Sequence, residues 1–84
     1  MEVDIYTIIN DPEGYREIFV RKNDSPYRFF NNGDFRLIPE SLPVRPQGGG
    51  LANNIISAIN ENGYYRSITS SSNRINTVES STGV

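Results

Sequence analysis

Few residues of this chain could do chemistry, because it contains no histidine and no cysteine. Histidine is the commonest general base and transition-metal ligand, and cysteine supplies thiolates and disulfides. Carboxylates, hydroxyls and guanidinium groups remain. Seven of the eight basic residues are arginines, and only Lys22 is a lysine. Arginine is enriched at protein interfaces, where lysine is depleted, although lineage bias in arginine use explains the count equally well.

The carboxylates of Asp11, Glu13 and Glu17 lie close along the chain. Acid–base catalysis needs two carboxyl groups in environments that separate their pKa values, whereas we expect these three in a turn and its flank, in water. No serine has a histidine or a strained glycine turn to activate it, and no acidic group has the spacing of a calcium loop. We therefore predict no catalytic residue, no metal site and no cofactor.

A run of glycines precedes the segment with helical periodicity and comprises Gly48, Gly49 and Gly50. A glycine-rich turn at a helix start can present backbone N–H groups to an anion, and Arg45 is the nearby cation. The run lacks the Lys-Ser/Thr of a phosphate loop and the spaced glycines of a dinucleotide fingerprint. A hinge and an anion-binding site at these four residues remain as alternatives, and we favour the hinge.

The segment from residue 27 to residue 38 is rich in aromatic and arginine side chains. Asn32-Gly33 between two apolar runs is a strong hairpin signal, because a type I′ turn needs positive φ at both positions. One face of that hairpin would carry four side chains: Tyr27, Phe29, Arg36 and Ile38. Aromatic and arginine side chains anchor protein interfaces, and the same types stack nucleic-acid bases. We predict that this face binds a partner and that the other joins the core.

A first hairpin is predicted over residues 3–21. Residues 3–9 are rich in β-branched and aromatic types, and Pro12 and Gly14 favour a turn into a return strand. One face of this hairpin, with Tyr6 and Ile8, is almost wholly apolar, and we expect it to be the core side. The other face mixes apolar and polar residues.

Residues 51–62 repeat apolar side chains at helical spacing, and Gly63 follows at the usual position after a helix. Residues 64–69 and 74–79 predict a weaker third hairpin. The whole is predicted to be one α+β domain over residues 1–79: a mainly antiparallel sheet of hairpins with one amphipathic helix packed on one face. Residues 39–50 would form a Pro/Gly-rich connector inside it, and residues 80–84 a short tail.

The chain has 84 residues and a net charge of −2, so no long-range field favours nucleic acid or an anionic membrane. No apolar run approaches the roughly 20 residues that span a bilayer, and a cytoplasmic protein is expected. We expect a small non-enzymatic protein-binding module, an inhibitor or adaptor, which could pair with a second copy of itself. The alternative is a small-ligand binder for a nucleotide or short oligonucleotide, and an enzyme comes third.

Overall fold

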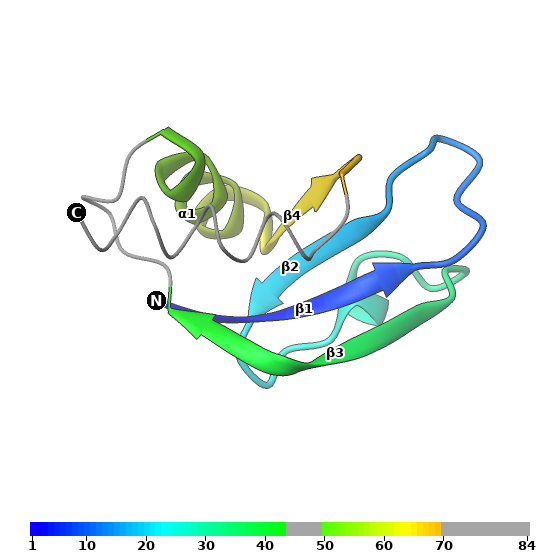
Figure 1. Cartoon of the computed structure of the whole chain (residues 1–84), viewed down its shortest axis with the longest axis horizontal. Helices are drawn as coiled ribbons and strands as arrows, with labels where there is room; N and C mark the ends of the chain where they lie inside the picture. The colour runs from blue at the N-terminus through cyan, green and yellow to red at the C-terminus, as the bar shows by residue number, and fades with distance from the viewer. Residues whose placement is uncertain (44–49, 70–84) are drawn as a thin grey trace.

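The computed structural model describes residues 1–43 and 50–69, which form a four-stranded antiparallel sheet and one α-helix (Figure 1). The predicted α+β class is therefore confirmed. The elements in chain order are β1 (Glu2–Ile8), β2 (Glu17–Arg21), the 3-10 turn η1 (Pro26–Arg28), β3 (Phe35–Pro43), α1 (Gly50–Asn62) and β4 (Tyr64–Ser67). The strands lie in the order β3-β1-β2-β4. Over the described residues, the helix found is too short or too polar to cross a membrane.

The turn between β1 and β2 forms as the sequence predicts. The Asp11 carbonyl accepts a hydrogen bond from the Gly14 N–H at 3.0 Å, and the Asp11 carboxylate accepts from the backbone N–H groups of Glu13 and Tyr15 at 3.2 and 3.0 Å. Gly14 has φ of 85°, a conformation that a residue with a Cβ adopts only under strain. Asp11 and Gly14 therefore close the loop through backbone chemistry.

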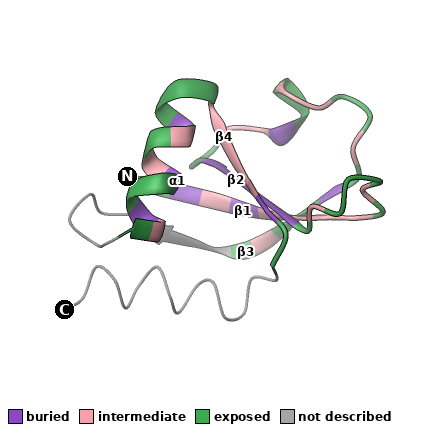
Figure 2. Ribbon diagram, turned by 90° about the horizontal axis from the view of Figure 1, so that it is seen from above, coloured by how far each residue is buried: buried purple, intermediate pink, exposed green. Residues whose placement is uncertain are grey.

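Both faces of the sheet are buried, so the prediction of a single core side is wrong. The register places Tyr6 beside Ile18 on one face, as expected. Helix α1 covers the opposite face, where Phe19 is fully buried, and the segment 22–34 covers the face of Ile18. Buried residues follow β1 and β2 (Figure 2). The polar residues that made the helix-covered face look mixed lie at the strand ends, so its centre is apolar.

The predicted hairpin between residues 27 and 38 is wrong, because its first half is not a strand. The Ser25 hydroxyl caps the turn η1 by accepting from the Tyr27 N–H at 3.2 Å, and Pro26 occupies the first position. Pro favours that position because its φ suits a helical start and no N–H is needed there. Neither Asn32 nor Gly33 has a positive φ. The 3-10 turn favoured by Ser25-Pro26 therefore forms, and the tight hairpin turn favoured by Asn32-Gly33 does not.

Strand β3 pairs with β1 and extends further than predicted. Residues 39–43, expected to belong to an irregular connector that ends at Gly50, continue the strand instead. The strand lies at the edge of the sheet, where a proline need not break a ladder of hydrogen bonds, and its register with β1 shifts as at a bulge. Residues 44–49 of the connector lie outside the described residues, and Gly50 begins α1.

Helix α1 confirms the predicted helix to within one residue. Three of its side chains are fully buried: Ala52, Ile55 and Ile59. Gly63 ends the helix with φ of 92°, and its N–H donates to the Ile59 carbonyl at 2.8 Å. Strand β4 then pairs with β2. The second half of the predicted third hairpin, residues 74–79, and the tail of residues 80–84 lie outside the described residues.

Candidate functional site

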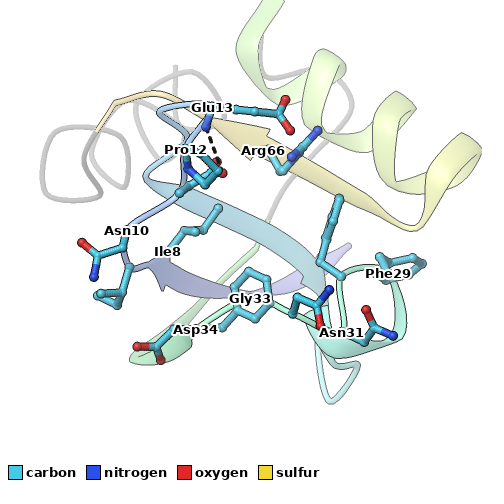
Figure 3. Close-up of a pocket in the computed structure, with 14 residues that line it drawn as sticks. Ile8, Asn10, Pro12, Glu13, Phe29, Asn31, Gly33, Asp34 and Arg66 are labelled. Carbon is cyan, nitrogen blue, oxygen red and sulfur yellow. Dashed lines mark hydrogen bonds between the residues drawn. The ribbon is translucent and has the colours of Figure 1, made fainter.

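A pocket of about 590 Å³ opens at one end of the sheet (Figure 3). Two loops supply most of its lining: residues 9–13, which follow β1, and residues 29–34, which lead from η1 into β3. Arg66 of β4 completes it. Ligand pockets in proteins measure about 300–1,000 Å³, so this volume suits a small molecule or a few side chains of a partner.

The pocket has an apolar floor formed by aromatic rings and Ile8. Phe29, Phe30 and Phe35 line it, and all belong to or pack against the core on the sheet face away from α1. The rings of Phe29 and Phe30 contact that of Tyr64 with centroids 5.2 and 4.8 Å apart. Ring contacts at these separations stabilise a fixed arrangement. The floor is thus formed in advance of any ligand.

The Arg66 guanidinium lies among aromatic rings at the pocket wall. Its Cζ is 4.1 Å from the centroid of Tyr15, 4.6 Å from that of Phe30 and 5.8 Å from that of Tyr64. Among the residues whose side chains the structure describes, 1–39 and 50–69, no carboxylate lies at ion-pair distance from it. Cation–π attraction to ring faces is worth about 0.5–2 kcal/mol. Arg66 therefore joins β4 to the loop of residues 29–34 through Phe30 and to the segment before β2 through Tyr15.

The rim of the pocket is polar and mainly acidic. Asp11, Glu13 and Asp34 contribute three carboxylates, against the single guanidinium of Arg66. Asp34 is exposed, while its backbone carbonyl accepts a hydrogen bond from the Ile9 N–H at 2.9 Å. Figure 3 shows Asp34 on one side of the opening and Glu13 on another. The pocket combines an apolar floor with a rim of net negative charge.

The structure does not bring the four predicted partner-binding residues onto one face. Tyr27 is 46% exposed and stacks edge-on against Phe35, whose N–H donates to the Tyr27 hydroxyl at 3.3 Å. Phe29 lines the pocket. Arg36 is exposed and Ile38 packs against the core beneath α1, on the other side of the sheet. The four separate because the hairpin that would have aligned them does not form.

Of the predicted anion site, the structure describes only Gly50, which is exposed at the start of α1. Arg45, Gly48 and Gly49 lie outside the described residues, so the choice between hinge and anion site stays a prediction. Where the chain is described, no three acidic residues are grouped as metal ligands.

Sequence reasoning missed Arg66, Leu37 and the burial of Glu17. Glu17 was expected in water, but its side chain is 2% exposed because β2 begins there and the residue faces the side of α1. The alternation Tyr64–Arg66 was visible in the sequence. What was not visible is that β4 pairs with β2 and so places Arg66 opposite Ile18, beside the pocket.

Tyr6 lies on the pocket side of the sheet, and its titration gives a testable effect on stability. Burial raises the pKa of Tyr6, and the charges of Asp4 and Asp24 and the neighbouring Tyr27 raise it further. The unfolded chain therefore loses this proton first. The contribution of Tyr6 to stability is fully present below about pH 10, the ordinary tyrosine pKa, and is lost as the pH rises through the folded value.

We expect the variant Tyr6→Phe to lose less stability than the wild-type chain between about pH 9 and about pH 11. Urea unfolding at each pH measures the difference in the free energy of unfolding between the two proteins. Curves that stay parallel over this range would show that the tyrosine does not titrate differently in the folded chain.

No protein-family model, no curated protein and no solved structure matches this chain.

Proposed function

We propose that this chain is a small non-enzymatic protein-binding module, an inhibitor or adaptor, that binds its partner on the sheet face away from α1. One observation supports this most directly: two large exposed apolar side chains, Tyr27 and Leu37, adjoin the aromatic-floored pocket. Their exposed fractions are 46% and 53%. Single exposed apolar residues are common on protein surfaces, but a group beside a pocket is typical of a binding site.

The two side chains adjoin the pocket through Phe35, which lines it. Tyr27 contacts the Phe35 ring with centroids 5.0 Å apart. Leu37 is two positions further along β3, so it lies on the same face, and it pairs with Tyr6. The aromatic floor, Tyr27 and Leu37 therefore lie on the same side of the sheet, away from α1, and we call this surface the pocket face.

A nucleotide or an oligonucleotide is the less favoured ligand. Three carboxylates against one guanidinium at the pocket oppose a phosphate there. A partner protein can place apolar side chains on the floor without that conflict. The absence of cysteine suits a reducing compartment, and we place the protein in the cytoplasm, where a second copy of the chain is one possible partner.

The proposal can be tested by selecting a displayed library of random peptides on the full chain. Selected peptides are expected to bind the wild-type protein and to lose about ten-fold or more in affinity on the variant Leu37→Ser, since burying a leucine is worth about 1.5–3 kcal/mol. Fluorescence anisotropy measures the affinities. Sedimentation of the free protein shows whether two copies already cover this face.

The matched control is Asn54→Ser, an exposed position on α1, on the other side of the sheet. It should leave the affinities unchanged. Peptides that bind equally well to Leu37→Ser, or a library that yields no binder, would contradict the proposed function.

A further inference from the structure

We infer that the pocket receives a basic side chain, arginine or lysine, from the partner that the pocket face binds. This inference rests on the proposed function and names the chemistry of its partner. It follows from the arrangement of charge and aromatic surface around one opening.

The charge of the lining comes first. The lining includes three carboxylates, of Asp11, Glu13 and Asp34, and one guanidinium, of Arg66. The pocket therefore carries a net charge of −2 (three negative groups and one positive). The attraction of a cation toward such an opening is strengthened by its low-dielectric walls. An anionic group would meet repulsion from two sides of the rim.

The carboxylate of Asp34 is also available to a partner, whereas that of Asp11 already accepts two backbone hydrogen bonds within its turn. Two other acidic residues of the described surface are neutralised within the chain: Glu2 by Lys22 at 3.1 Å and Asp24 by Arg28 at 3.1 Å. Over the same residues, the side chain of Asp34 has no such partner. Its position is nevertheless held, because its carbonyl accepts from the Ile9 N–H. A held and uncompensated carboxylate at a pocket rim is suited to a charge-assisted hydrogen bond.

The floor suits the rest of a long basic side chain. Arginine and lysine lay their methylene groups along apolar surface and keep the charged head at a polar edge. Here Ile8, Phe30 and Phe35 form the surface, and Asp34 stands at the edge. The floor also accepts a guanidinium directly, since the Cζ of Arg66 lies 4.6 Å from the Phe30 centroid. A metal ion is a poorer occupant, because the described chain groups no three acidic ligands.

Three short peptides with blocked ends test the inference on the isotope-labelled full chain: acetyl-Leu-Arg-Leu-amide, and the same peptide with Gln or Glu at the centre. Chemical-shift titration at millimolar peptide follows the backbone amides. The Arg peptide is expected to shift those of residues 10, 11, 13 and 31–35 with saturation, and to bind about five-fold more tightly than the Gln peptide. The Glu peptide should bind most weakly, and added salt should weaken the Arg peptide alone.

Asp34→Asn is expected to weaken the Arg peptide by about two- to five-fold, the usual worth of an exposed pair. Its matched control is Glu61→Gln, which removes the same charge from an exposed position on α1. Equal binding of the Arg and Gln peptides, an unchanged affinity in Asp34→Asn, or no shift from any peptide would overturn the inference. If library peptides still depend on Leu37 in that case, the proposed function stands and only the basic side chain is wrong.

Discussion

The variant Phe19→Ala is expected to lose about 3–5 kcal/mol of folding free energy, the usual cost of removing a buried aromatic side chain. Phe19 is 0% exposed and lies at the centre of the core between sheet and helix. It pairs with Ile5 of β1 and with Tyr65 of β4, whose ring meets it edge-on at 5.8 Å. The truncation would leave a void that neighbours from three strands and α1 cannot fill together.

Small domains are stable by only about 0.05–0.15 kcal/mol per residue, so this loss is a large share of the total. Urea unfolding followed by far-ultraviolet circular dichroism measures it. Leu37→Ala is the control: it also truncates a large apolar side chain to alanine, but one that is 53% exposed, and it should cost less than about 1 kcal/mol. A loss in Phe19→Ala as small as that of the control would show that the helix does not pack over Phe19.

A second large effect is expected at Gly63, where alanine should cost on the order of 3 kcal/mol. Two causes add. Gly63 has φ of 92°, which strains any residue with a Cβ. A Cβ there would also overlap the Phe29 ring, which lies directly on the glycine.

Gly14→Ala separates the two causes. Gly14 has a similar φ of 85°, but no atom lies within 4 Å of the place its Cβ would take, so only the backbone strain of about 1–2 kcal/mol applies. In a Phe29→Ala background, Gly63→Ala should cost no more than Gly14→Ala. Denaturant unfolding of the four variants measures these free energies, and equal losses at the two glycines in the wild-type background would refute the close contact with Phe29.

This contact links the end of α1 to the pocket. Phe29 is at once a lining residue and the group that rests on Gly63. A larger residue at position 63 would therefore displace part of the pocket lining as well as strain the helix end. Changes of this kind should weaken peptide binding to the pocket face without touching the peptide.

Local signals in the sequence predicted the parts of the fold whose cause is local. The β1–β2 turn depends on Asp11, which accepts hydrogen bonds from backbone N–H groups no more than four residues away, and on Gly14, which adopts a positive φ without strain. Helix α1 depends on its own apolar spacing, and its end depends on Gly63. Each of these was predicted close to its observed position because its formation depends on neighbouring residues and not on pairing with a distant segment.

Long-range pairing decided the parts that were wrong. Two segments could pair with β3: the nearby residues 27–30 through a tight turn, or β1, which is distant in sequence. Strand β1 pairs with β3, and it offers the longer partner. The Asn-Gly signal carries no information about the competition between them. The candidate site depends on the same pairing, since β4 joins β2 and places Arg66 beside loops from distant parts of the chain. The pocket could therefore not be assembled from residue types alone.

Strand β3 is a nine-residue edge, a length that invites a neighbouring chain to add itself to the sheet. Few backbone N–H groups on the outer edge of β3 are free to donate to an added strand. Ile9 donates to the Asp34 carbonyl, so by the alternation of antiparallel pairing Phe35 turns its amide outward, where the Tyr27 hydroxyl already accepts it. Pro39 has no amide at all, which leaves Leu37 as the one outward donor between residues 35 and 39. A strand that paired along this stretch would therefore receive few backbone hydrogen bonds from β3, which disfavours the addition of a neighbouring chain here.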